Sequence, residues 1–144
     1  MSPLQRHAKV DRQKVKGKNR RYPIGTVVAV KPSHYYYFLS AYGSMDKDLR
    51  TASKISYIWQ TLDEIWLAIR TTGHCEPLSI PIIGSDLART DLPRMLLIKM
   101  IVLSFIAASK EKFASRKLTI MIYPGDLHLM NLLDIKDFLD SSVT

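Results

Sequence analysis

The order in which strand-like runs and helical patterns alternate is the feature that most constrains the fold of this chain. Four runs rich in β-branched or aromatic residues have the length of strands: 24–30, 35–42, 77–83 and 117–124. Three segments repeat apolar residues at helical spacing: 51–72, 92–109 and 132–139. The resulting order (strand, strand, helix, strand, helix, strand, helix) predicts an α/β fold with helices packed on a mostly parallel or mixed sheet.

The segment 51–72 has the clearest helical pattern. Its apolar residues recur every three or four positions and form one stripe, made of Ile55, Ile58, Leu62, Ile65 and Ile69 and extended by Trp59 and Trp66. A stripe of this kind predicts a helix that packs its apolar face on the sheet. Gly73 follows the segment directly and is the expected C-cap.

The segment 92–109 is apolar on nearly every side, which predicts a deeply buried helix. A membrane-spanning helix needs about 20 apolar residues. Arg94 and Lys99 interrupt this segment too early for that, so no membrane span is expected. Pro81 cannot donate a hydrogen bond to a strand ladder, so we expect it near the end of the strand 77–83 or at a bulge.

The net charge of +8 is concentrated at the N-terminus. Residues 1–22 contain eight Lys and Arg and one acid, Asp11, whereas residues 23–144 contain 13 basic and 12 acidic residues. We therefore expect residues 1–21 to be a basic flexible arm or linker and residues 22–144 to form one α/β domain. An arm of this charge could touch phosphate, and nucleic acid binding through residues 6–21 is one form of that contact.

Cysteine and histidine usage gives no catalytic or metal site. The single cysteine, Cys75, excludes an internal disulfide and fits a reducing compartment, so we expect a cytoplasmic protein. The four histidines lack the spacing of zinc ligands, so no metal and no cofactor are expected. His74 and Cys75 are adjacent, but a nucleophile and its base usually meet in space rather than in sequence.

A candidate ligand site lies where two strands end. The strands 77–83 and 117–124 are consecutive across one helix, so a right-handed crossover should place them side by side. Ligands of open α/β sheets bind beyond the carboxyl ends of strands. The loop Gly84–Arg89 follows the first strand and precedes a helix N-terminus, which favours anions. The second strand ends at the aromatic Tyr123. A phosphate loop beside an aromatic ring suits a nucleotide.

Four stretches along the chain carry a resemblance to a known family: YPIGTVVAV, YYYFLSAYGSMD, IPIIGSDLAR and KLTIMIYPGD. They resemble the second half of a macro domain, in the variant found in Thoeris anti-phage effectors, over roughly residues 22–140. The resemblance implies a three-layer macro-like fold. It also implies a sensor for an ADP-ribose-derived nucleotide signal that a partner TIR protein makes.

The resemblance also implies which residues bind the nucleotide. The second phosphate-binding loop of the family matches Pro81, Ile82, Ile83, Gly84, Ser85, Asp86, Leu87, Ala88 and Arg89. Tyr123 matches the residue that lines the nucleoside end of the cleft.

The chain departs from the family pattern in two places. Asp86 stands where the family has glycine, and two unit charges at about 4 Å repel by about 1 kcal/mol even in water, so a carboxylate there should lower the affinity for a pyrophosphate. The family's first half has no counterpart here, so three alternatives are open: the domain is truncated at its N-terminal side, another subunit covers an exposed strand edge, or the fold has rearranged. Such a chain exposes strand edges, which a second subunit in a homo-oligomer could cover.

The leading hypothesis is a non-enzymatic binding module for an ADP-ribose-type nucleotide, the sensor part of a TIR-linked bacterial defence effector. One alternative is an ADP-ribosyl hydrolase, although Asp86 is the only acid in the loop and no partner for general-base chemistry is evident. The other is an interaction subunit that uses its basic arm on nucleic acid or an acidic partner.

Overall fold

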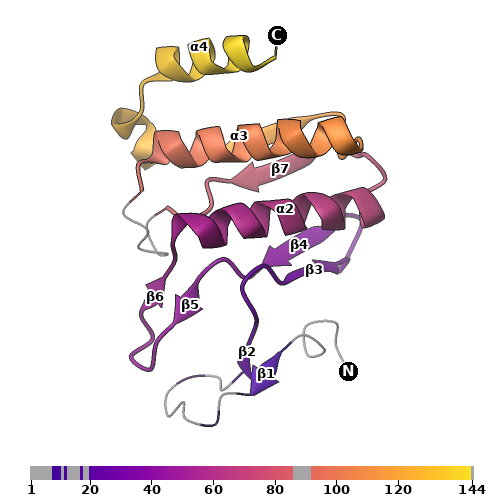
Figure 1. Cartoon of the computed structure of the whole chain (residues 1–144), viewed down its shortest axis with the longest axis vertical. Helices are drawn as coiled ribbons and strands as arrows, with labels where there is room; N and C mark the ends of the chain where they lie inside the picture. The colour runs from indigo at the N-terminus through magenta and orange to yellow at the C-terminus, as the bar shows by residue number, and fades with distance from the viewer. Residues whose placement is uncertain (1–7, 11, 13–16, 18–19, 86–91, 144) are drawn as a thin grey trace.

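The structure, a computed structural model, describes residues 8–10, 12, 17, 20–85 and 92–143 (Figure 1). Its elements follow one another in this order: β1 (Lys9–Val10), β2 (Arg20–Arg21), β3 (Val27–Val30), β4 (Tyr37–Ser40), β5 (Ser44–Met45), β6 (Thr51–Ala52), α2 (Ile55–Thr72), β7 (Leu78–Pro81), α3 (Arg94–Glu111), β8 (Leu118–Met121), the 3-10 helix η2 (Pro124–Leu129) and α4 (Leu132–Ser142). All four expected strands and all three expected helices are present, and the strands are shorter than predicted.

The strands pair in four separate two-stranded sheets. β1–β2, β3–β4 and β5–β6 are antiparallel, and β7–β8 is parallel. The mixed character of the fold is confirmed, but a mostly parallel sheet is wrong for the described residues. The reason lies in the connections, because β3 and β4 are joined by residues 31–36 alone. A link of that length allows a hairpin, whereas a parallel pair needs a crossover of a dozen or more residues.

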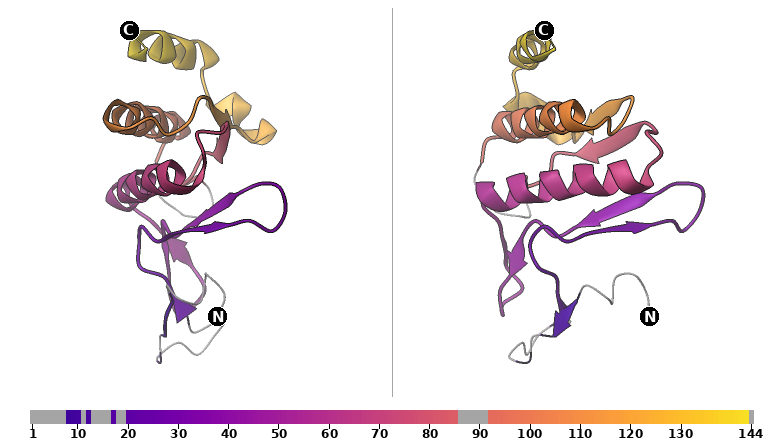
Figure 2. Two further views of the ribbon diagram at one scale, coloured as in Figure 1. Left: turned by 90° about the vertical axis from the view of Figure 1, so that its right-hand side faces the viewer. Right: turned by 45° about the vertical axis from the view of Figure 1, so that its right-hand side comes forward.

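Both long helices lie on the same side of the strands (Figure 2). α2 and α3 pack side by side, and α4 lies beyond α3 on the side away from α2 (Figure 1). In β8, Leu118 and Ile120 face the helices, whereas Met121 is exposed. In β4, Phe38 faces the core and Leu39 is exposed. The described residues therefore cover one face of the strands, and they do not form the third layer that the resemblance implies.

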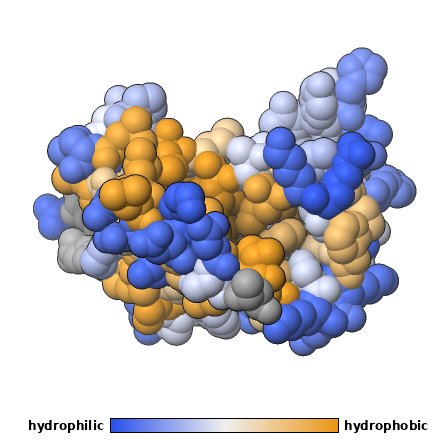
Figure 3. Space-filling model, turned by 90° about the horizontal axis from the view of Figure 1, so that it is seen from above, coloured by the Kyte–Doolittle hydropathy of each residue, from blue (hydrophilic) through white to orange (hydrophobic). Residues whose placement is uncertain are grey.

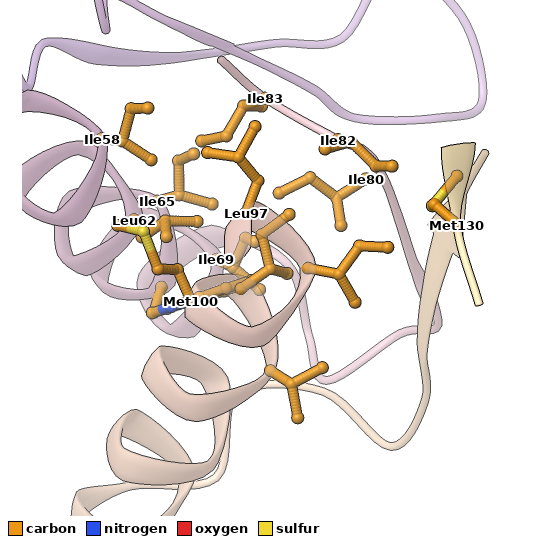
Figure 4. Close-up of a cluster of buried hydrophobic side chains, with 14 residues drawn as sticks. Ile58, Leu62, Ile65, Ile69, Ile80, Ile82, Ile83, Leu97, Met100 and Met130 are labelled. Atoms are coloured by element: carbon orange, nitrogen blue, oxygen red, sulfur yellow. The ribbon is translucent and has the colours of Figure 1, made fainter. Parts of the chain in front are cut away.

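The core lies between α2, α3 and β7 with its following loop (Figure 4). The predicted stripe of α2 is largely confirmed, because its buried apolar side chains are Ile58, Leu62, Ile65, Trp66 and Ile69. Two of its expected members are wrong: Ile55 and Trp59 are exposed, Trp59 by 41%. The two side chains lie one turn apart at the start of α2. They stand on an edge of the apolar stripe that α3 and the strands do not cover.

α3 is buried as its composition predicts. Its buried side chains lie on several sides of the helix: Leu97, Ile98, Met100, Ile101, Val102 and Ser104. This follows from its position between α2 and α4 and over β7 (Figures 1 and 2). Within the described residues, no helix has both the length and the apolar character that crossing a membrane requires.

α4 is attached more lightly than α2 and α3. Asn131 caps its start by accepting hydrogen bonds from the N–H groups of Leu133 and Asp134, at 3.0 and 3.4 Å. Its inner face leans on α3, where the Lys99 ammonium lies 5.5 Å from the centre of the Phe138 ring. None of its residues is buried. Apolar atoms consequently remain on the surface of the face that carries α4, interspersed with charged groups (Figure 3).

The N-terminal hairpin β1–β2 lies at the opposite end of the molecule from α4 (Figures 1 and 2). Its register pairs Lys9 with Arg21 and Val10 with Arg20, so it falls inside the segment expected to be a basic arm. The placement of the domain boundary at residue 21 stays a prediction.

One buried hydrogen bond joins the two long helices. The Trp66 indole N–H donates to the Ser104 hydroxyl at 2.9 Å, and both side chains are fully buried. The Ser104 hydroxyl in turn donates to the Ile101 carbonyl at 3.0 Å. The Trp66 ring also meets Phe105 edge-on, with ring centres 5.3 Å apart.

Replacing Ser104 with alanine should lower the free energy of unfolding by about 1–3 kcal/mol, because the Trp66 N–H would be buried without an acceptor. Urea denaturation measures this loss. The matched control is Ser109→Ala on the same helix, since the buried Ser109 hydroxyl has no hydrogen-bond partner among the described residues. Equal losses in the two variants would contradict a specific role for the Trp66–Ser104 bond.

Candidate functional site

The carboxyl ends of β7 and β8 meet at one edge, as the sequence predicts. The two strands pair in parallel from Leu78 with Leu118 to Pro81 with Met121. Pro81 is the last residue of β7, which confirms its expected place near a strand end. The chain therefore leaves both strands at the same level. We call the residues beyond this level the strand-end site: Pro81–Ser85, Arg94 and Tyr123–Asp126.

Gly84 is required by the packing beneath this site. It is buried and has a φ of +85°, in the region that favours glycine. A Cβ at this position would lie 2.5 Å from Ile58 Cδ1 and 3.4 Å from Leu97 Cδ2. The Ser85 hydroxyl donates to the Ile82 carbonyl at 3.0 Å and closes the turn. The Gly-Ser break thus lets the chain turn directly against the ends of α2 and α3.

The structure divides the predicted phosphate-loop residues into groups. Ile82 and Ile83 are buried members of the core, so their side chains cannot line a ligand and only their backbone is available (Figure 4). Gly84 and Ser85 form the turn above them. Asp86, Leu87, Ala88 and Arg89 lie outside the described residues, and their proposed contacts stay predictions.

Tyr123 presents its ring to solvent at the other strand end. It is 71% exposed and lies directly before η2, two residues after β8. Its ring lies across the backbone of Gly125, where a Cβ would stand 2.5 Å from Tyr123 Cε1. The exposed Tyr123 ring is therefore a surface on which a planar group can stack.

Arg94 and Asp126 form an ion pair that the sequence reasoning missed. Arg94 Nε lies 2.9 Å from Asp126 Oδ2, and the side chains are only 19% and 11% exposed. Arg94 is the first residue of α3, and Asp126 lies in the first turn of η2. The pair joins the helix after one strand to the turn after the other. One signal was available in the sequence, because a cation in the first turn of a helix is unfavourable unless an anion offsets it.

The adjacent His74 and Cys75 do not form a reactive pair. Both follow the C-cap Gly73 in a left-handed turn, with φ values of 53° and 60°, and Cys75 is exposed. They lie before β7, at the opposite end of the strands from the strand-end site. In the part of the chain that the structure describes, no three His, Cys, Asp or Glu residues gather as metal ligands would.

The sequence of this chain matches the model of a known family. Residues 2–123 match the family model described as Thoeris protein ThsA, Macro domain. The chain belongs to the ThsA macro-domain family. The predicted resemblance to the macro domain of Thoeris effectors is thereby confirmed, and it ties this chain to the Thoeris anti-phage system. That the chain holds only the second half of a macro domain stays a prediction. The match begins in the basic N-terminal segment and ends at Tyr123. A search of curated proteins finds no match.

The macro domain also has an open groove of about 570 Å³ away from the strand-end site. It runs along α2 next to α3 and is lined by Ile55, Ser56, Trp59, Gln60, Asp63, Glu64 and Met100. Partial burial raises the pKa of Asp63 above its ordinary value of 3.8, and the nearby Glu111 carboxylate raises it further. Nothing in this groove matches the residues that the family resemblance assigns to a ligand.

Replacing Gly84 with alanine should lower the free energy of unfolding by about 2–4 kcal/mol, because the positive φ and the contact with Ile58 both oppose a Cβ. Ile58→Val removes the Cδ1 atom that a Cβ would meet. Urea denaturation of the two single variants and the double variant forms a complete cycle. We expect the double variant to lose less unfolding free energy than the two single variants lose in sum. Strict additivity would show that the Ile58 contact is not the constraint.

Replacing Asp63 with asparagine should stabilise the macro domain at neutral pH. A pKa raised in the folded state means that the fold favours the protonated carboxyl, so the stability it contributes is present below pH 3.8 and is lost as pH rises through the folded pKa. The gain should therefore be largest near pH 7 and vanish below pH 3.8. Chemical denaturation across this range measures it, with Glu64→Gln as the control for removing an acid. An equal gain in that control would assign the effect to net charge.

Proposed function

We propose that this macro domain is a non-enzymatic binding module for an ADP-ribose-derived nucleotide, and that it serves as the sensor part of a Thoeris anti-phage effector. One observation carries the proposal: in a chain of the ThsA macro-domain family, the Gly84–Ser85 turn and the exposed Tyr123 ring emerge from one edge of a parallel strand pair. This is the edge at which α/β folds bind ligands.

The turn and the aromatic ring of the strand-end site have separate roles in this proposal. Backbone N–H groups of the turn after Gly84 approach the diphosphate, and the positive φ of Gly84 gives this turn its shape. The predicted loop residues Asp86–Arg89 continue this phosphate contact. Tyr123 stacks on a planar ring at the nucleoside end. Ile82 and Ile83 hold the turn from below by their burial in the core.

A binding role suits the one carboxylate among the described residues of the site better than hydrolysis does. Asp126 is the one acid among the described residues of the strand-end site, and its Oδ2 lies against Arg94 Nε. A general base must be free to accept a proton from a water. This arrangement supports a sensor over an ADP-ribosyl hydrolase.

ADP-ribose should raise the melting temperature of the chain by several degrees when its concentration is a hundred times the dissociation constant, because binding then adds about 2.7 kcal/mol of stability. Differential scanning fluorimetry measures the shift, and calorimetric titration gives the affinity. An unchanged melting temperature at millimolar ADP-ribose and at millimolar concentrations of its cyclic and conjugated forms would refute the proposed function.

Replacing Tyr123 with alanine should weaken ADP-ribose binding at least fivefold, since stacking on an aromatic side chain contributes about 1–3 kcal/mol per base. The melting temperature without ligand should change little because the ring is exposed. Tyr35→Ala is the matched control, since Tyr35 is 73% exposed in the loop between β3 and β4. Equal loss of affinity in both variants would contradict the role given to Tyr123.

A further inference from the structure

The ion pair between Arg94 and Asp126 is more buried than the other pairs between acidic and basic side chains in the described residues. Its two side chains are 19% and 11% exposed, whereas Glu76 and Arg116 are 69% and 66% exposed in their pair and Lys136 and Asp140 are similarly open. The Arg70–Glu111 pair has one open partner. Removing either partner of a buried pair leaves an uncompensated charge, so each of these two side chains strongly constrains the other.

Arg94 lies on the face of α3 that is turned towards the strand-end site. It precedes Leu97 by three positions on α3, so both side chains lie on the same face of the helix. Leu97 is fully buried, and its Cδ2 lies 3.4 Å from the position that a Cβ of Gly84 would take. Helical side chains tilt towards the N-terminus. The guanidinium of Arg94 therefore lies on the side of α3 that faces the Gly84 turn.

Asp126 reaches the same place from the other strand end. Its backbone N–H donates to the Tyr123 carbonyl at 2.9 Å, so the carboxylate and the Tyr123 ring belong to one turn. This carboxylate brings a negative charge to the first turn of α3, where the helix N-terminus and Arg94 together favour an anion. A phosphate group offers the same kind of acceptor to a guanidinium and binds it at least as well.

We propose that Asp126 is an internal counter-anion for Arg94, and that the phosphate of an incoming ligand competes with its carboxylate for the guanidinium. The inference rests on the proposed function, because the competing ligand is the phosphate-bearing nucleotide of that site. Asp126 then lowers the affinity for the nucleotide in two ways: it occupies Arg94, and it repels the phosphate. The pair sets the ligand concentration at which the sensor responds.

Replacing Asp126 with asparagine tests the exchange. Asparagine keeps a carbonyl oxygen beside the Arg94 guanidinium, but it removes the competing charge. We expect at least threefold tighter binding of ADP-ribose and a steeper fall of affinity with salt, even though the variant melts at a lower temperature. Glu76→Gln is the matched control, since its exposed pair with Arg116 lies at the opposite ends of β7 and β8. It should leave the affinity unchanged.

A purely structural clamp would give the opposite sign. If the pair only held α3 against η2, Asp126→Asn and Arg94→Lys would both weaken binding. Under the exchange, Asp126→Asn tightens binding and Arg94→Lys weakens it at least threefold, because lysine cannot bind phosphate in a bidentate manner. Nuclear magnetic resonance of the Arg94 Nε–H in the wild-type chain gives an independent reading. Its signal should move when ligand is added.

The outcomes separate this inference from the proposed function. If the wild-type chain binds ADP-ribose and Asp126→Asn binds it equally or more weakly, the exchange is wrong and the function stands. If neither chain binds ADP-ribose, the function is wrong, and inorganic pyrophosphate replaces it as the probe. Tighter pyrophosphate binding by Asp126→Asn than by the wild type then supports the exchange. Equal pyrophosphate affinity of the two chains would overturn the exchange.

Discussion

The packing of α2 against α3 is the interaction on which the rest of this structure depends. The two 18-residue helices bury their facing side chains completely at Ile58, Leu62, Trp66, Leu97 and Ile101. Full burial of a large apolar side chain contributes about 1.5–3 kcal/mol each, so this layer dominates the stability of the fold. β7, the Gly84 turn and β8 are held against it, and α4 is added from outside (Figure 1). The packing of α2 and α3 therefore fixes the geometry of the strand-end site.

Much of the fold could be predicted from the sequence because its signals are local or periodic. The stripe of α2 and the all-round apolar character of α3 predict their burial, and parallel strands joined by one helix predict the convergence of Gly84 and Tyr123. The order of elements predicts a mostly parallel or mixed sheet, and it does not single out the antiparallel pairing of β3 with β4. The shortness of the loop 31–36 was the physical clue. The exposure of Trp59 could not be predicted, since it depends on which edge of α2 the other elements leave open.

The candidate site could be predicted only in outline. Sequence patterns locate loops at strand ends, but they do not reveal that Ile82 and Ile83 are core residues whose side chains are unavailable to a ligand. They also gave no pairing between Arg94 and Asp126, which lie far apart in the chain and meet only when α3 docks. The site consequently combines two kinds of residue. Some belong to a motif that can be recognised in the sequence, whereas the charged pair can be recognised only in the folded structure.

The two principal strand pairs of the described chain differ in how far apart their partners are in sequence, and this difference bears on the order of folding. β3 and β4 meet through a short loop, so their hairpin is a local event on the microsecond scale. β7 can meet β8 only after all of α3 has been placed between them, and the entropy of closing that loop must be paid first. The strand-end site is therefore expected to form late. A chain still emerging from the ribosome therefore carries its hairpin well before its strand-end site is assembled.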